Sequence, residues 1–166
     1  MYRVLIAIVD AAVARLFSFE RTSDGEGLHD QLTELGDLVN PARRLRPSEL
    51  FSDSGRGASH TGEHGYTLDD RREDHMARLD GDFAQSVATE LARLATDVDR
   101  LVLCASPHML GHLRDVTVEL HRPGLIIDEL PRDLVKLTPP QLRDQLASYG
   151  FLPPPLPRPT LDERRP

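Results

Sequence analysis

The sequence predicts a single α/β domain, residues 1–150, built on one mixed β-sheet of about five strands with covering helices. The chain opens with an unbroken apolar run, Val4 to Val9, which is typical of a strand buried on both faces. More strand-like segments follow in the first third of the chain, where short connections favour an antiparallel meander. The second half alternates strands and helices, which indicates parallel strands joined by right-handed crossovers.

The meander is predicted from two further segments. Asp10 to Ala12 break the first apolar run, and Val13 to Glu20 then reads as a second strand. A third strand is expected over Leu32 to Val39, although Gly36 interrupts it. Residues 41–69 show no periodicity and are predicted as a long loop. A structureless run of this length inside a compact domain is typically functional or disordered.

A long helix is predicted from near Asp70. Asp70 and Glu73 have the spacing of a capping box, in which each end of the motif satisfies a backbone amide of the first turn. Apolar residues then recur at steps of three and four, which predicts one face packed on the sheet. They are Met76, Leu79, Phe83, Val87, Leu91 and Leu94.

The second half is read in the same way. Arg100 to Ala105 is predicted as a strand, and Ser106 and Pro107 as the N-cap and first residue of a helix that ends near Leu120. Leu125 to Asp128 is predicted as another strand. Thr138 begins a last helix, which Gly150 can end. Residues 151–166 are proline-rich and are predicted as a disordered tail.

Composition limits the classes of function. An apolar content of 39% and a charged content of 28% are typical of a globular protein. The net charge of −7 argues against nucleic-acid binding through the charge of the whole molecule, but it allows binding through a local basic patch. The single cysteine suits a reducing compartment. No segment reads as a signal peptide or a membrane span, so we expect a cytoplasmic protein that is not bound to a membrane.

No metal or cofactor is expected from the histidines. His60, His64 and His75 lie in or beside the predicted loop, without the cysteines or the regular spacing of a zinc site. His108 and His112 are four residues apart on one helix face, but Met109 stands where a HExxH motif has its glutamate.

Two alternatives concern the acidic and basic residues. Asp10 ends the first strand, and the order of elements is that of ribonuclease H folds, so a metal-dependent nuclease or hydrolase is one hypothesis. Asp128 is the one further candidate acid, and Asp10 can equally cap a hairpin turn. The arginines in and around the loop can form a phosphate-binding patch or a solvated, charge-paired face. They are Arg43, Arg44, Arg46, Arg56, Arg71 and Arg72.

Several segments resemble one family. IVDAAVARLFSFE, LGDLVNPARRLRPSELFSDSGRG, DDRREDHMARLDGDFAQSVATEL and RLVLCASPHMLGHLR are similar to the bacterial host attachment proteins over roughly Tyr2 to Leu146. That family in turn resembles the central domain of eukaryotic and archaeal class I peptide release factors and of Pelota-type factors. Asp10, Ala14, Arg15 and Phe17 match the hairpin pattern of those domains, and Arg71, Arg72 and His75 resemble their helix opening.

The resemblance implies a ribonuclease H-like fold of the translation-machinery type and a ribosome or a structured RNA as partner. It also implies a non-catalytic role, because the Gly-Gly-Gln of release factors occurs nowhere in this chain. A protein partner that supports attachment is the alternative. The residues expected to bind are Asp10, Arg15, Arg56, His60, His64, Arg71, Arg72 and His75.

Overall fold

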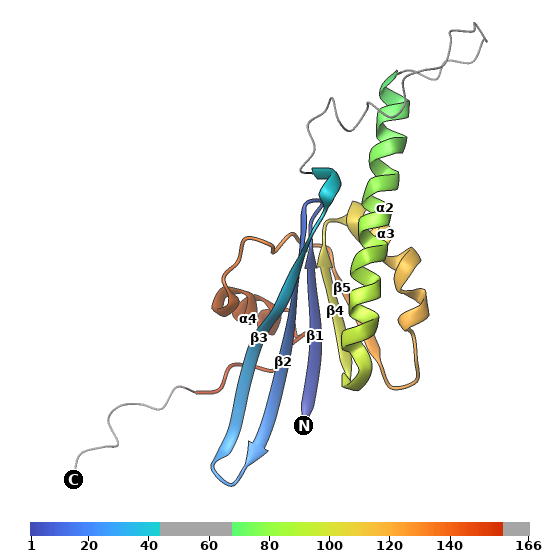
Figure 1. Ribbon diagram of the computed structural model, residues 1–166. Helices are drawn as coiled ribbons and strands as arrows, with labels where there is room; N and C mark the ends of the chain where they lie inside the picture. Colours follow the sequence, from blue (N-terminus) through green and yellow to red (C-terminus); the bar gives the residue numbers. More distant parts are fainter. Residues whose placement is uncertain (44–67, 158–166) are drawn as a thin grey trace, which may run out of the picture.

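The computed structural model describes residues 1–43 and 68–157, which form one five-stranded sheet covered by helices (Figure 1). The strand order is β3-β2-β1-β4-β5. The strands are β1 (Tyr2–Val9), β2 (Val13–Asp24), β3 (Gly27–Val39), β4 (Arg100–Ala105) and β5 (Ile126–Leu130). The helices are α2 (Leu68–Leu94), α3 (Pro107–Thr117) and α4 (Pro139–Ser148), with short 3-10 turns η1 (Pro41–Arg43), η3 (Ala95–Asp97) and η4 (Val118–Leu120). The predicted single mixed sheet is confirmed.

β1 is the central strand, as its apolar run predicts. It pairs antiparallel with β2 and parallel with β4, and every residue from Val4 to Val9 is buried. Alternate side chains of β1 enter the two opposite cores of the domain. An unbroken apolar run is therefore required here, because neither face of this strand meets water.

The meander is longer than the sequence predicts. β2 continues to Asp24 and β3 begins at Gly27, so the hairpin extends well beyond the predicted strand ends. Most side chains of β3 are exposed, which removes the apolar signal that would have revealed the additional residues. Gly36 has a φ of +153° and lies opposite Leu16, beside a shift in the register between β2 and β3. A bulge of this kind explains why a glycine occurs inside a strand.

The parallel half follows the prediction closely. β4 pairs parallel with β1 and with β5. Ser106 caps α3 by accepting a hydrogen bond from the Met109 amide, and Pro107 is the first helical residue. Thr138 and Gln141 form a complete capping box at the start of α4. Gly150 follows α4 with a φ of +78°, which is the backbone conformation that a helix-ending glycine supplies.

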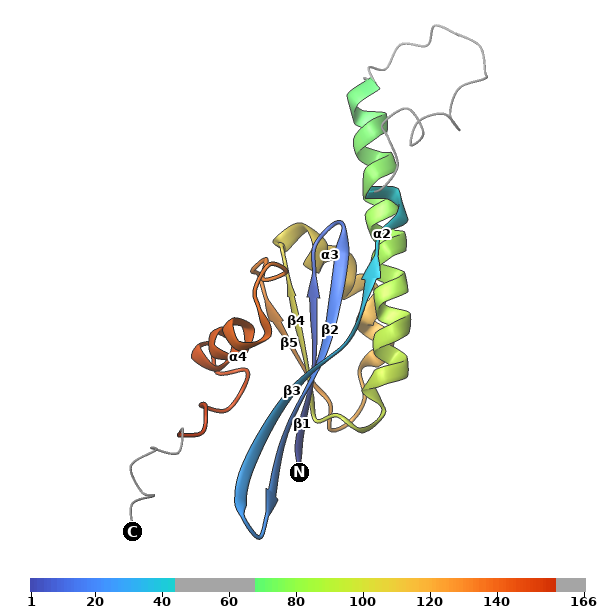
Figure 2. The same cartoon turned by 60° about the vertical axis from the view of Figure 1, so that its left-hand side comes forward.

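The helices form one layer on each face of the sheet (Figure 2). α2 and α3 cover the first face, where Phe83, Val87 and Leu91 meet Leu110 and Leu113 in a buried cluster. α4 covers the opposite face through Leu142 and Leu146. The burial of apolar side chains on both faces is the main source of stability for this three-layer arrangement.

α2 extends beyond the end of the sheet (Figures 1 and 2). Asp80 is the first buried residue along this helix among the side chains that the structure describes. Residues 68–79 span about 18 Å at the normal helical rise. Although it is 27 residues long, α2 is not apolar enough to cross a membrane, and neither is any other helix within residues 1–43 and 68–157.

The segment after α4 differs from the predicted disordered tail, which was expected to begin at residue 151. Leu152 is buried in the core cluster under α4, and Phe151 packs against that cluster. Arg21 and Arg143 donate hydrogen bonds to the carbonyls of Pro154 and Pro153. Residues 151–157 are therefore part of the domain, and the rest of the predicted tail, residues 158–166, lies outside the described residues.

Candidate functional site

Three strands, together with β5, end at the same edge of the sheet, which we call the loop-bearing end. β1 and β4 are parallel, and β3 runs in the same direction because the two pairings β1–β2 and β2–β3 are both antiparallel. Their carboxyl ends are Val9, Ala105 and Val39. η1, which follows β3, and the overhanging part of α2 lie at this end of the sheet (Figure 1). The carboxyl ends of parallel strands are the usual position of ligand sites in α/β sheets.

Asp10 organises the turn between β1 and β2. Its Oδ1 atom accepts hydrogen bonds from the amides of Ala12 and Val13, both at 2.7 Å. Asn40, which is 2% exposed, holds the same turn from the other side: its Nδ2 donates to the Ala11 carbonyl at 2.8 Å. Asn40 Oδ1 in turn accepts from the amide of Ala42 in η1. The two side chains thus fix the start of the segment that leads into residues 44–67.

Asn40 was not singled out from the sequence. The available signal was the Asn-Pro pair at positions 40 and 41, which is typical of a turn. Its burial depends on contact with the β1–β2 turn, which is distant in sequence.

Asp80 lies at the centre of a polar cluster between η1, α2 and α3. It is only 3% exposed, and its two carboxylate oxygens lie 3.1 and 3.2 Å from Nη2 of Arg43. Nε2 of His108, from the first turn of α3, lies 3.5 Å from Oδ2 of Asp80. A nearly buried carboxylate requires charged or hydrogen-bonding partners, and Arg43 supplies them here.

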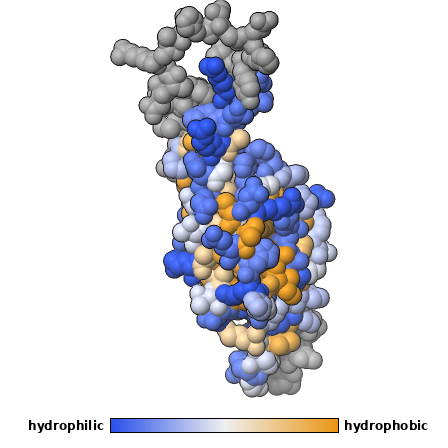
Figure 3. Space-filling view, turned by 90° about the vertical axis from the view of Figure 1, so that its right-hand side faces the viewer, coloured by the Kyte–Doolittle hydropathy of each residue, from blue (hydrophilic) through white to orange (hydrophobic). Residues whose placement is uncertain are grey.

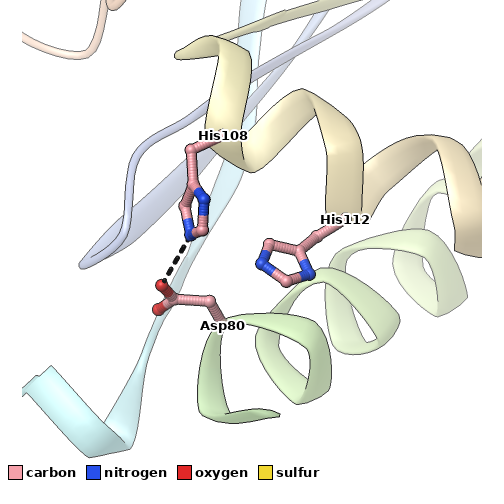
Figure 4. A group of neighbouring side chains, drawn as sticks. All are labelled: Asp80, His108 and His112. Carbon is pink, nitrogen blue, oxygen red and sulfur yellow. Dashed lines mark ion pairs between the residues drawn. The ribbon is translucent and has the colours of Figure 1, made fainter. Parts of the chain in front are cut away.

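His112 completes the cluster from the next turn of α3 (Figure 4). The rings of His108 and His112 are 4.9 Å apart and nearly perpendicular. One potential ligand atom from each of Asp80, His108 and His112 lies within 4.8 Å of the other two. Among the described residues this is the one group of three or more side chains that could hold a metal ion, and Asp10 is not in it.

The spacing of His108 and His112 predicts that they share one helix face, but the carboxylate opposite them was not predicted. Asp80 belongs to α2, and only the packing of α2 against α3 brings it to the histidines. A signal was present in the helix pattern, because Asp80 is an acidic residue on the apolar stripe that includes Met76, Phe83 and Val87. A charge on the buried face of a helix indicates a partner from another element.

The predicted binding residues of α2 lie on its overhang. Arg71 and Arg72 are exposed, and His75 is half-buried. Asp70, Glu73 and Asp74 are exposed beside them, so both signs of charge are present. Arg56, His60 and His64, the predicted residues of the loop, lie outside the described residues.

Arg15 lies apart from this group and makes contacts within the fold. It forms two hydrogen bonds with the Glu34 carboxylate, at 2.8 and 2.9 Å, and two with the carbonyls of Val135 and Leu137. The bonds with Glu34 raise the pKa of Arg15 and lower the pKa of Glu34. Arg15 thus joins the meander to the segment before α4, on the face of the sheet opposite α2 and α3.

Comparisons with known proteins place the chain in a family. Residues 5–146 match the model of a family described as "Protein required for attachment to host cells". No curated protein matches the sequence significantly.

Two solved structures are similar in part. The crystal structure of the archaeal translation termination factor aRF1 has 11% identity and a TM-score of 0.45, and the match covers 90% of this chain and 35% of that one. The Aquifex aeolicus Ppx/GppA phosphatase, type II variant, has 13% identity and a TM-score of 0.35, over 78% of this chain and 36% of that one. This chain therefore spans about a third of either structure.

The family match covers most of the domain, from within β1 to within α4. It confirms the resemblance drawn from the hairpin, the helix opening and the β4–α3 segment, and the chain therefore belongs to the host attachment family.

Proposed function

We propose that the protein is a non-catalytic binding module of the host attachment family that associates with ribosomes or another structured RNA through its loop-bearing end. The observation that carries the proposal is the overhang of α2. Within the part of the chain that the structure describes, no side chain from Asp70 to Leu79 is fully buried, and a helix that projects in this way is suited to contact with a partner.

The chemistry of the overhang favours a polar, anionic partner. Arg71, Arg72 and Arg78 are exposed along it. Figure 3 shows mostly hydrophilic side chains over this part of the molecule, while apolar side chains gather lower, over the part of the helical layer that faces the viewer. Arginine guanidinium groups bind phosphate oxygens through paired hydrogen bonds. The neighbouring acidic residues oppose this attraction and make the salt dependence of binding the decisive measurement.

Cosedimentation of the full chain with ribosomes at increasing salt tests the proposal. Arg71→Glu/Arg72→Glu should weaken association tenfold or more, since a hydrogen bond to a charged group contributes about 1.5–3 kcal/mol. The double variant should also flatten the plot of log affinity against log salt, because fewer counterions are released. Arg93→Glu/Arg114→Glu is the matched control, with the same change in charge at exposed arginines outside the overhang.

The outcome separates an RNA partner from a protein partner. If the wild-type protein does not associate with ribosomes or RNA, or if the α2 double variant associates with an unchanged salt slope, the RNA proposal is wrong.

A second candidate function, attachment support through a protein partner, is favoured by one observation. A mostly apolar groove of about 550 Å³ lies between the end of β3, η1 and α2, lined by Val39, Ala42, Leu79 and Phe83 among others. A photo-crosslinking amino acid at Leu79 should then capture a protein in intact cells, whereas the same group at exposed Thr89 on α2 should not. Equal labelling at both positions would count against this candidate.

A further inference from the structure

We propose that Asp80, His108 and His112 form a binding site for a divalent transition-metal ion, and that zinc is the ion best suited to it. The site lies at the root of the α2 overhang, where α2, α3 and η1 meet. This proposal goes beyond RNA association and does not depend on it.

The separations within the cluster fit an ion better than a hydrogen bond. His108 Nε2 and Asp80 Oδ2 are 3.5 Å apart, which exceeds the usual length of a hydrogen bond. Two ligands of a tetrahedral zinc ion, with bonds of about 2.0–2.1 Å, are separated by about 3.4 Å. All three ligand atoms already lie within 4.8 Å of one another, so small rotations of the two imidazole rings would bring them to this spacing.

The ligand set selects the class of ion. Two imidazole nitrogens and one carboxylate oxygen are the donors of many three-ligand zinc sites, in which a water molecule takes the fourth position. Magnesium and calcium prefer sites made of oxygen alone. His108 is two-thirds exposed at 66%, so the fourth position can open to solvent.

The fold fixes the carboxylate of Asp80 in position, whereas the imidazole rings of His108 and His112 can still rotate. Asp80 is fixed by burial and by Arg43, and hydrogen bonds of this kind orient metal-binding carboxylates in known sites. His108 and His112 are one helical turn apart on α3, so both rings face the same side of this helix. Capping by Ser106 fixes the first turn of α3 and with it the position of His108.

Arg43 has two opposing effects on the site. It orients Asp80, but its positive charge repels a dication and its Nη2 occupies both carboxylate oxygens. Each carboxylate oxygen keeps a lone pair for the ion, but binding would place a dication beside the guanidinium charge of Arg43. We therefore expect Arg43 and the metal ion to compete for Asp80.

A calorimetric titration of the full chain with Zn²⁺, after removal of bound metal by a chelator, tests the site. We expect one ion per chain and a rise of several degrees in the melting temperature when zinc is in excess. His108→Gln and His112→Gln should each weaken binding at least tenfold, and both keep the fold because neither ring is in the buried core. His121→Gln, at an exposed histidine that follows η4, is the matched control and should bind zinc as the wild-type protein does.

Titration with Co²⁺ distinguishes a metal site from a simple ion pair between Asp80 and His108, because only a metal site would give a cobalt absorption spectrum. Cobalt in a four-coordinate site of this type should give an intense visible absorption band, which the His108→Gln/His112→Gln double variant should lose. The proposal is wrong if no saturable binding occurs, if both single variants bind as the wild type does, or if only His60→Gln/His64→Gln abolishes binding.

Replacement of Arg43 by Met tests the competition. The variant keeps an unbranched side chain but removes the charge, so zinc should bind about tenfold more tightly. The melting temperature of the metal-free variant should fall, because Asp80 then loses its main cationic partner. Unchanged or weaker zinc binding by Arg43→Met would overturn the competition between Arg43 and the ion.

Discussion

Cys104 is the last residue but one of β4 and has no exposed surface, in the core cluster covered by α4. Burial raises the pKa of its thiol to about 12. The thiolate is the reactive form, and a rise of this size lowers the thiolate fraction at neutral pH by about a thousandfold. We therefore predict that a thiol reagent modifies the denatured protein quickly and the native protein only as it unfolds. Rapid modification of the native protein would show that this strand is accessible.

Asp30 joins the meander to α4 and to the last described segment. Its carboxylate accepts hydrogen bonds from Arg21 at 2.6 and 2.7 Å and from Arg143 at 2.6 Å, and all three side chains are largely buried. The two bonds from Arg21, and after them the single bond from Arg143, lower the pKa of Asp30. A carboxylate whose pKa is lower in the folded state stabilises the protein at pH values above its unfolded-state pKa. This contribution to stability is lost as the pH falls through the folded-state pKa.

Asp30→Asn should therefore lower the free energy of unfolding by about 3 kcal/mol at pH 7, since it leaves two arginines without their anion. The difference from the wild-type protein should shrink as the pH falls below about 4, the ordinary pKa of an aspartate, because the stability from the lowered pKa is lost in this direction. Urea unfolding at several pH values measures both effects. A difference that stays constant across this range would mean that the charge of Asp30 does not contribute.

The residues of the candidate site differ in how far the sequence could reveal them. The helical spacing of His108 and His112 is local, and the sequence predicts it. The start of α2 is predicted near Asp70, but the helix begins at Leu68, so Asp70 lies inside it and is not its N-cap. The position of Asp80 beside the histidines results from the packing of two helices, and no local pattern encodes it. Arg15 matches the hairpin pattern of the resemblance, but its contacts with Glu34 and with the chain before α4 appear only in the folded molecule.

At the scale of the elements, the glycines of α3 and of the following turn allow a paired test. Gly111 lies inside α3, and a methyl group added there would meet no atom within 4 Å. Gly111→Ala should raise the free energy of unfolding by about 0.5–1 kcal/mol, because alanine is the better helix former. Gly124 has a φ of +89°, so Gly124→Ala should instead destabilise the protein. Chemical denaturation of both variants checks the opposite signs, and a loss of stability in Gly111→Ala would contradict the prediction.

The elements that the sequence predicts best are those with a local physical cause. The caps at Ser106 and Thr138 specify where α3 and α4 begin, and the apolar run specifies where the central strand ends. The outer half of the β2–β3 hairpin was missed, because exposed strands carry no burial pattern. The segment around Leu152 was missed because its proline-rich composition is typical of disorder, whereas its position depends on Arg21, Arg143 and the core beneath α4.

At the scale of the whole molecule, the sequence allows a prediction about catalysis. The chain has no Gly-Gly-Gln, the motif that its resemblance to release factors would require for peptide release. We expect that the purified protein does not hydrolyse peptidyl-tRNA on ribosomes, in an assay where a complete release factor serves as the positive control. Hydrolysis that disappears on substitution of Gly57 or Gly62 would contradict this expectation.

The direction of β1 determines which end of the domain faces solution when the protein is attached to a surface by its N-terminus. β1 runs from the N-terminus towards the loop-bearing end, so the N-terminus lies at the opposite end of the sheet (Figure 1). Phe151 to Pro154 share a surface pocket with Tyr2 and Arg21, which places the last described segment near the N-terminus. A tether attached at the N-terminus would therefore hold the domain by its far end, with the α2 overhang and the Asp80 cluster directed into solution. Immobilised protein in this orientation would present the whole candidate surface to a large particle such as a ribosome.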